Sequence, residues 1–425
     1  MSNKIKSEIN KIPIPPGLHK KSLAGVQQAK LEQRKKFGVF TNRKKTLAAV
    51  LAGLLLFSAT FFHTEVLAAV KRALQFVPGL GLIHEEEMPV ERYILQKPVT
   101  LELDNGRIMV TGMMIDEKMT LINVVGYDTP LRQNIKIVNE KGNEYKEFSI
   151  PSSQTLSGSK EWIASYWHDG KLDITEEAQI ILEGKQDIII PLTLEKAKSY
   201  ESYTDMGEIS TINSVEIVAI PQRVADKLRI SLISQHPKDF RISDYGLFPM
   251  YAREEQMISV QDSVGKEYEI ENSPGISAPS SEFYFPLAEN EVENYVITLP
   301  EIYVVYSDEQ KVTLPIPETE ADLNESFTLS GFPVQLTKVE RIEEDRVRVY
   351  VDVQFDEQND KQLRNFRIKE MGHMVKVSDG TGEILYLEFD IEPIRKKIKV
   401  TFQQPEVILK GPWKFEFPVE RYFLK

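Results

Sequence analysis

Ser157 and Lys160 have the spacing of a Ser-x-x-Lys motif, in which a lysine helps a serine to attack a carbonyl carbon. Enzymes with this motif also carry Ser-Asp-Asn and Lys-Thr-Gly elements, and neither tripeptide occurs in this sequence. A four-residue match without its companions is common by chance. The pattern therefore predicts a polar loop at 157–160 rather than a nucleophile.

Metal-ligating residue types are sparse. The chain has no cysteine, which excludes disulfides, thiol catalysis and cysteine-ligated metal sites. Asp356 begins a stretch like a calcium loop, but Lys361 replaces the required glycine and Arg367 the bidentate glutamate, so we expect a solvated turn. The six histidines never fall at ligand spacing: His19, His63, His84, His168, His236 and His373. No phosphate-binding glycine loop occurs either, so we expect no catalytic residue, metal or cofactor, and predict that the protein is not an enzyme.

The longest apolar element runs from Thr46 to Val70, and Leu47 to Phe62 carries no charge. About 20 apolar residues cross the roughly 30 Å hydrocarbon layer as a helix. Twelve basic and two acidic residues precede the run, so this head carries +10; since the whole chain carries −12, the remainder carries −22. Basic flanks stay in the cytoplasm. The sequence therefore predicts a single-pass protein of the cell membrane, with a cytoplasmic N-terminus and an extracytoplasmic C-terminus.

A cleaved export signal is the alternative for this run, because Val66-Leu67-Ala68 has the small-residue character of a cleavage site. The head of 45 residues is longer than a usual complete signal, so we favour the retained anchor. The helix is expected to continue through Lys71–Phe76 until Pro78-Gly79 ends it.

Beyond about Pro98 the apolar pattern changes to period two, most clearly from Val347 to Phe355. This period predicts antiparallel strands with one wet face. Three similar sets of elements recur. Each has a polar turn between β-rich runs, at 116–118, 226–227 and 344–346, and then a hairpin-like element around Gly142, Gly265 or Gly382. Each set closes on an apolar strand that ends in proline: Ile188–Pro191, Val312–Pro315 and Phe415–Pro418.

These sets predict a mainly β chain with three tandem β-sandwich-like domains behind a single N-terminal transmembrane helix. The expected parts are a basic cytoplasmic head at 1–45, the helix at 46–70, a membrane-proximal linker at 71–95, and repeats 1, 2 and 3 at 96–203, 204–322 and 323–425. The third set is short after Gly382, so we expect one hairpin to be missing there. Trp162 and Trp167 are an odd number of positions apart, so they should lie on different faces of a strand; one should lie in a core, and the other could be an exposed contact. Trp413 should pack in the third sandwich. The acidic ectodomain argues against nucleic acid as a ligand.

The head contains a stretch rich in helix-forming residues, Leu18 to Lys36, so we expect a helix there. Two interpretations stay open. The helix could be a solvated segment attracted to anionic lipid, each basic residue contributing about 1 kcal/mol, or it could dock an intracellular partner. Docking would use the residues Leu18, Leu23, Val26, Lys30, Leu31 and Arg34.

Two segments of the head and one after the apolar run resemble those of a known class of protein. The segments Ile12-Pro-Ile-Pro-Pro-Gly-Leu-His-Lys-Lys-Ser22, Ala29-Lys30-Leu-Glu32 and Phe76-Val-Pro-Gly-Leu-Gly-Leu82 resemble those of single-pass envelope proteins of Gram-positive Bacillota with β-rich domains of unknown function. The resemblance is best over residues 1 to about 125. Several such proteins are anti-sigma-factor-like, which implies that they hold an extracytoplasmic-function sigma factor at the membrane. This chain lacks the His-x-x-x-Cys-x-x-Cys signature of zinc-type anti-sigma factors, so no zinc mechanism carries over.

We therefore expect a single-pass, anti-sigma-factor-like membrane regulator with an extracytoplasmic β-rich sensing or interaction region and a short cytoplasmic docking head. Its partners would be the lipid bilayer and, through the head, a cytoplasmic sigma factor. The alternative is a passive structural or adhesion module of the envelope, for which the head is only an anchor.

Overall fold

The computed structural model describes residues 73–85, 90–146, 148–155, 160–247, 256–273, 279–288, 292–356, 358–370, 373–377 and 383–422. All of them belong to one compact unit, Ala52–Lys425. The basic head and the apolar run at 46–70 lie outside the described residues. Among the residues that are described, no helix has the length and apolar character needed to cross a membrane.

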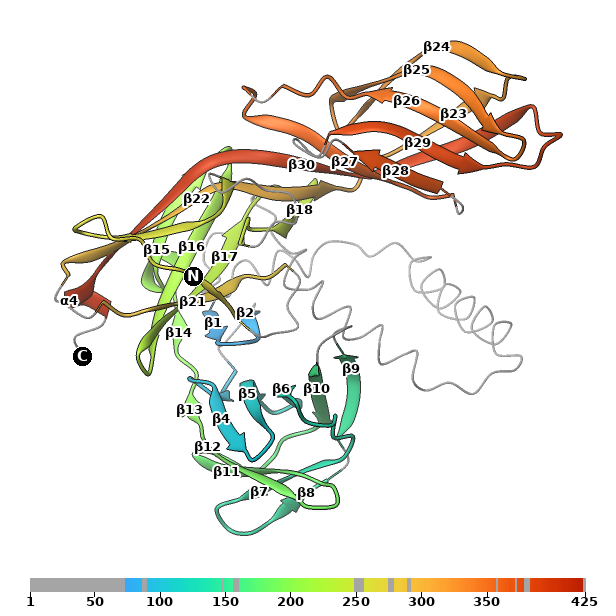
Figure 1. The fold of residues 1–425 in the computed structure, drawn as a ribbon. Coiled ribbons are helices and arrows are strands. Elements are labelled where there is room, and N and C mark those ends of the chain that lie inside the picture. The colour runs from blue at the N-terminus through green and yellow to red at the C-terminus, as the bar shows by residue number, and fades with distance from the viewer. Residues whose placement is uncertain are drawn as a thin grey trace, which may run out of the picture. The chain divides into compact units, whose positions relative to one another are not determined.

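The described chain is almost entirely β-strand, which confirms the mainly β prediction. Each repeat contains five antiparallel strands in the same spatial order (Figure 1). In repeat 1 they are β4 (Val99–Leu103), β5 (Gly106–Ile115), β6 (Met119–Tyr127), β10 (Glu161–Asp169) and β9 (Ser149–Thr155), extended by β3 (Tyr93–Ile94) and β13 (Glu195–Lys196). In repeat 2 they are β15 (Glu208–Ile212), β16 (Val215–Val224), β17 (Lys227–Gln235), β21 (Glu282–Pro286) and β20 (Glu271–Asn272). In repeat 3 they are β24 (Glu320–Leu329), β25 (Phe332–Glu343), β26 (Arg346–Asp352), β29 (Ile384–Asp390) and β28 (His373–Val377).

A second layer of strands shares a buried apolar cluster with each five-stranded set. In repeat 1 it consists of β12 (Ile188–Thr193), β11 (Glu177–Leu182), β7 (Ile135–Asn139) and β8 (Glu144–Tyr145). In repeats 2 and 3 one six-stranded sheet contains β18 (Phe240–Asp244), β19 (Ser259–Asp262), β22 (Asn294–Tyr306), β23 (Glu309–Pro315), β27 (Lys361–Ile368) and β30 (Lys397–Pro418). A single buried apolar cluster joins residues of both repeats. The expected boundary at 322/323 therefore does not separate two independent sheets, and the number of domains stays a prediction.

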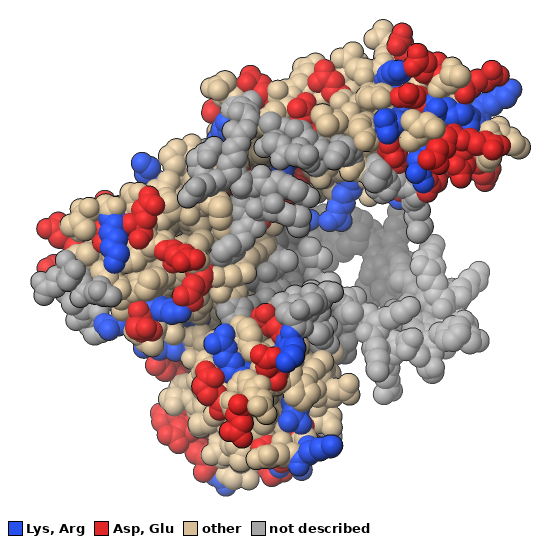
Figure 2. All heavy atoms as spheres, viewed as in Figure 1, with Lys and Arg blue, Asp and Glu red and all other residues tan. Residues whose placement is uncertain are grey.

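Side-chain alternation produces this layering. In β26, Val347 and Val349 are fully buried, whereas Arg348 between them faces the other side of the sheet and binds the Glu388 carboxylate at 2.6 Å. Figure 2 shows basic and acidic side chains interspersed over the surface of β24, β25 and β26. The charges on this face of the sheet thus occur in mixed pairs.

The three sets of elements share one strand order, but one of the sequence matches was to a different strand. The strands before Gly142 and Gly265, β7 and β19, lie in the second layer beside β11 and β22. The strand before Gly382 is β28, which pairs with β29 in the five-stranded set. The equivalent of β7 in repeat 3 is β27, which pairs with β30. The sequence match at Gly382 was therefore to a different element, and only β29 and β30 follow Gly382 among the described strands because the equivalent of β7 comes before it.

The tryptophans separate as their spacing predicts in repeat 1. Trp162 is buried in the core, and Trp167 is partly exposed on the other face of β10. The prediction for Trp413 is wrong: its indole Nε1 donates a hydrogen bond to the Val215 carbonyl oxygen of repeat 2, at 3.1 Å. The chain at Asp356 forms the expected turn, in which Gln358 N donates to Asp356 Oδ1 at 2.9 Å.

Candidate functional site

The first described element is a β-hairpin rather than the helix expected up to Phe76. β1 (Ala73–Val77) pairs with β2 (Gly81–Glu85) on one side and with β14 (Ser199–Tyr200) on the other. Leu80 N donates to the Val77 carbonyl oxygen at 3.0 Å and closes the turn. We call residues 73–85 the N-terminal hairpin. Pro78-Gly79 forms its turn instead of ending a helix, because the tertiary contacts of the flanking apolar residues outweigh local helix preference.

The two faces of the N-terminal hairpin contact different repeats. The face toward repeat 2 packs on Val218 and Ile220 through the residues Leu74, Phe76 and Leu82. The opposite face packs on Met114 and Met119 of repeat 1 through the residues Val77, Leu80 and Ile83. Alternation along the hairpin strands thus directs neighbouring side chains to different repeats.

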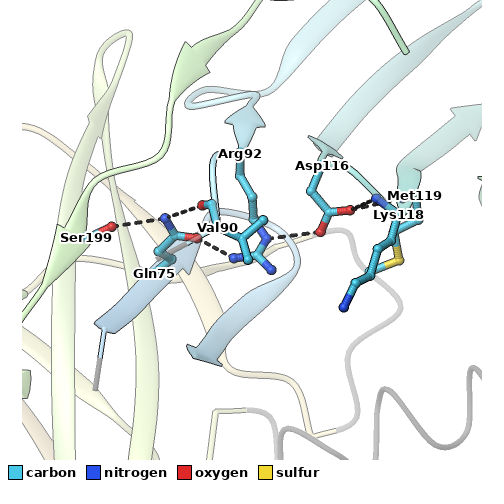
Figure 3. Close-up of polar contacts among 7 residues, drawn as sticks. All are labelled: Gln75, Val90, Arg92, Asp116, Lys118, Met119 and Ser199. Carbon is cyan, nitrogen blue, oxygen red and sulfur yellow. Dashed lines mark hydrogen bonds and ion pairs between the residues drawn. The ribbon is translucent and has the colours of Figure 1, made fainter. Parts of the chain in front are cut away.

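A buried polar network holds β1 to repeat 1 (Figure 3). Arg92 Nε lies 3.3 Å from Asp116 Oδ2, and an Arg92 Nη1–H donates to Gln75 Oε1. Gln75 Nε2 in turn donates to the Val90 carbonyl oxygen and to Ser199 Oγ, each at 3.0 Å. Gln75, Arg92 and Asp116 are only 2%, 6% and 4% exposed. The charges are therefore paired and removed from water, so loss of either partner would leave a buried charge uncompensated.

Asp116 also organises the turn between β5 and β6. Its Oδ1 accepts hydrogen bonds from Lys118 N at 2.8 Å and Met119 N at 3.0 Å. One oxygen thus holds the first polar turn of repeat 1 and the other meets the guanidinium of Arg92 (Figure 3). The local turn is in this way connected to the N-terminal hairpin.

The tip of the N-terminal hairpin is held by side chains of both repeats. Gly79 N donates to Glu282 Oε1 of repeat 2 at 3.2 Å, and the Gly79 carbonyl oxygen accepts from Asn123 Nδ2 of repeat 1 at 3.1 Å. Ser231 Oγ donates to the same Glu282 oxygen at 2.9 Å, and Ser165 Oγ donates to Asn123 Oδ1 at 2.6 Å. Both polar backbone groups of Gly79 are therefore bound by supported side chains.

A second polar contact links repeats 1 and 2 directly. Arg229 is 1% exposed, and an Nη2–H donates to the Gln96 carbonyl oxygen at 3.1 Å. Gln222 Oε1 also accepts from Arg229 Nη2, while Gln222 Nε2 donates to Gln96 Oε1 at 3.3 Å. Burial raises the pKa of the nearby Tyr284, and the positive charge of Arg229 opposes that shift. The tyrosine therefore stays neutral beside the buried guanidinium.

This arrangement can position a segment of chain, but its groups do not form a nucleophile–base pair or a metal site. Across the described ranges, no group of three or more His, Cys, Asp or Glu could hold a metal ion. Lys160 of the Ser-x-x-Lys match forms an exposed ion pair with Asp128 at 3.1 Å, and Ser157 lies outside the described residues.

The residues expected to dock a partner are not brought together by the described structure, because all of them lie outside it: Leu18, Leu23, Val26, Lys30, Leu31 and Arg34. Sequence reasoning missed the residues of the N-terminal hairpin network. The available signal was Pro78-Gly79 between two apolar stretches, which is typical of a tight turn as well as of a helix end.

Known proteins show little similarity to this chain. No family model matches the sequence. No curated protein matches it either. A solved structure described as "the crystal structure of the conserved domain protein from Bacillus anthracis" overlaps 55% of this chain and 82% of its own, with 11% identity and a TM-score of 0.20. An overlap at that TM-score carries no conclusion about fold or function.

Proposed function

We propose that this chain is a single-pass membrane regulator in which the N-terminal hairpin couples the β-rich repeats to the membrane anchor. The observation that supports this function is the position of β1. It begins at Ala73, three positions after the end of the apolar run at Val70, and it packs on both repeat 1 and repeat 2. A change in the way the two repeats meet would therefore displace the segment of chain that leads to the anchor.

The cytoplasmic end of the regulator is proposed from the resemblance to anti-sigma-factor-like envelope proteins. The head would use its helix at Leu18–Lys36 to dock a cytoplasmic sigma factor, and the extracytoplasmic repeats would sense or bind a component of the envelope. The basic flank and the apolar run support this orientation, since cytoplasmic flanks carry the excess of Lys and Arg.

The orientation is tested by single-cysteine labelling, for which the cysteine-free chain gives a clean background. Val264 is 79% exposed at a turn of repeat 2, so Val264→Cys should react with a membrane-impermeant maleimide on intact cells whose wall has been removed. Ser7→Cys in the head should react only after the membrane is opened. Equal labelling of both positions on intact cells would contradict the proposed orientation.

The regulatory role is tested by exchange of the head. In the full-length protein, an unrelated basic segment in place of residues 1–36 should abolish binding to the sigma factor encoded beside the gene and change transcription of its targets. The matched control replaces only lysines 4, 6 and 11, which lie before the docking stretch. If the exchange leaves binding, transcription and every envelope phenotype unchanged, the passive structural or adhesion module is the better account.

A further inference from the structure

The closing strand of repeat 1 returns beside the strand that precedes it. β11 and β12 form a hairpin in which Leu182 pairs with Ile188 and Gln179 with Pro191. The inward side of β11 carries Ala178, Ile180 and Leu182, all of which are buried. We call β11 the return strand and β12 the closing strand of repeat 1.

Repeats 2 and 3 contain the same two strands with a longer connection between them. By burial pattern, Tyr295, Ile297 and Leu299 in repeat 2 match the inward residues of the return strand, and Ile398, Val400 and Phe402 match them in repeat 3. In repeat 1 the apolar stretch of the closing strand begins at Ile188, six positions after Leu182. Val312 follows Leu299 by 13 positions, and Phe415 follows Phe402 by 13 positions. Both longer connections have the same length.

In repeats 2 and 3 the return strand does not pair with the closing strand of its own repeat. The return strand of repeat 2 pairs with the closing strand of repeat 3, from Asn294 opposite Pro418 to Leu299 opposite Trp413. The closing strand of repeat 2 pairs with the return strand of repeat 3, from Glu309 opposite Gln403 to Pro315 opposite Lys397. β22 and β23 thus lie one after the other along β30 (Figure 1).

From this crosswise register we propose that repeats 2 and 3 have exchanged their closing strands within one chain. Repeat 1 has the unexchanged arrangement, in which the connection forms a tight turn. In repeat 3 the connection is straightened into the continuous strand β30, and in repeat 2 it runs on from β22 to β23 with a break only at 307–308, as in domain swapping between copies of a protein. The site created by the exchange is a strand-acceptor groove in repeat 2, and its occupant is the C-terminal segment 411–422.

The contacts of the C-terminal segment are those of a member of repeat 2. Lys414 N donates to Ser210 Oγ at 3.2 Å, and Trp413 Nε1 donates to the Val215 carbonyl oxygen at 3.1 Å. Beyond the strand, the short helix α4 (Val419–Tyr422) places Arg421 Nη1 and the Tyr422 hydroxyl at 2.7 and 2.6 Å from Glu208 Oε1. The segment is therefore bonded to β15 and β16 as well as to β22.

Side-chain size favours the exchanged pairing over the unexchanged one. The closing strand of repeat 3 inserts Phe415 and Phe417, which are 1% and 0% exposed, whereas that of repeat 2 carries Val312 and Leu314 at the matching positions. Returning each strand to its own repeat would leave a cavity in repeat 2 and crowd the core of repeat 3. Cores resist both changes because they are close-packed.

Engineered disulfides in the full-length, cysteine-free chain distinguish the two pairings. Thr298 pairs with Lys414 in the exchanged arrangement. By analogy with Ile181 opposite Ile189 in repeat 1, it would face Thr313 in the unexchanged one. Directly opposed residues of antiparallel strands lie within disulfide range. The variant T298C/K414C should form an intrachain disulfide on mild oxidation, and T298C/T313C should not, while I181C/I189C serves as the positive control for oxidation.

Each other outcome of the cross-linking overturns the proposal. A disulfide in T298C/T313C would show that repeat 2 closes on itself. A covalent dimer of T298C/K414C would show that a second copy supplies the strand. With the positive control oxidised, failure of the T298C/K414C disulfide would show that the closing strand of repeat 3 does not occupy repeat 2.

Hydrogen exchange gives a second test that does not depend on cross-linking. Phe417→Ala should speed amide exchange in β16 and β17 of repeat 2 at least several-fold more than in β25 and β26 of repeat 3, and Leu314→Ala should do the reverse. Glu416→Ala, on the exposed side of the same strand, is the matched control. Faster exchange confined to repeat 3 in Phe417→Ala would overturn the proposal.

Discussion

Glu282 accepts a hydrogen bond from the backbone N–H of Gly79 at 3.2 Å, although 203 positions separate the two residues. The carbonyl oxygen of the same glycine is bound by Asn123 of repeat 1. One residue of a turn therefore connects two repeats, and the strand before that turn leads back toward the apolar run. A change in either repeat would therefore act on the N-terminal hairpin at Gly79.

Gly79→Ala should destabilise the protein, because Gly79 has a φ of +74° and an added Cβ would lie 2.4 Å from the Thr111 carbonyl oxygen. Strain of this kind costs about 1–3 kcal/mol. The measurement is denaturant unfolding of the full-length protein in micelles. The matched control is Gly142→Ala, where φ is +81° but no atom lies within 4 Å of the added Cβ. Equal losses of stability in the two variants would mean that the contact with Thr111 does not matter.

Arg92→Ala should lower the free energy of unfolding by about 3–5 kcal/mol, because it leaves the buried Asp116 carboxylate without its ion-pair partner. Unfolding should be followed by the fluorescence of Trp162, which is buried in repeat 1. The double variant R92A/D116A should lose less than the sum of the two single losses, because the partners are directly coupled. The control is Lys141→Ala in the exposed Lys141–Asp173 pair, which should change stability little. Additive losses would contradict the coupling.

Gly126→Ala should disturb the core of repeat 1, because the added Cβ would lie 2.2 Å from the Trp162 ring. The ring cannot move aside without losing the bond from its Nε1 to the Thr129 carbonyl oxygen at 2.8 Å. Overpacking of this kind costs about 1–3 kcal/mol. The change should shift the Trp162 emission as well as the unfolding midpoint, and an unchanged spectrum would show that the core accommodates the methyl group.

The strands were predictable because their signal is local. In β26 the alternation of valine with charged or polar residues marks one buried face whatever the neighbouring strand is. The closing strands were recognised in the same way, by apolar residues before a proline. The strands that pair with them could not be predicted. The apolar alternation of Phe415 and Phe417 is compatible with pairing to any strand that has an apolar face, so it does not identify β22 as the partner.

The candidate site could not be found from sequence for a related reason. Gln75, Arg92 and Asp116 are spread over more than 40 positions and form no motif. Their contact depends on the hairpin at Pro78-Gly79, which local propensity assigned to the end of a helix. Packing of Leu74 and Phe76 on repeat 2 favours a strand over a helix at these positions. The repeat 2 residues that they contact lie about 140 positions further along the chain.

The stability of the six-stranded sheet of repeats 2 and 3 should depend on pH through Glu301 of β22, which is 3% exposed. Burial raises the pKa of Glu301, and the hydrogen bond from the Tyr303 hydroxyl, at 2.6 Å, opposes that shift. Burial likewise raises the pKa of Asp244. A carboxyl group with a raised pKa in the folded state holds its proton more tightly there than in the unfolded chain. The free energy of unfolding therefore falls as the pH rises from the ordinary carboxyl pKa, about 4.3 for glutamate, through the raised value.

Glu301→Gln should remove part of this fall, because the amide does not ionise while Asp244 still does. Relative to the unmodified protein, the variant should be more stable at pH 7.5 than at pH 4.5. Unfolding at both pH values, followed by Trp413 fluorescence, measures the difference. Glu325→Gln, on the exposed side of β24, is the control and should follow the unmodified protein. If the Glu301→Gln curve instead runs parallel to the unmodified one between these pH values, Glu301 is ionised in both states and its burial does not penalise the charge.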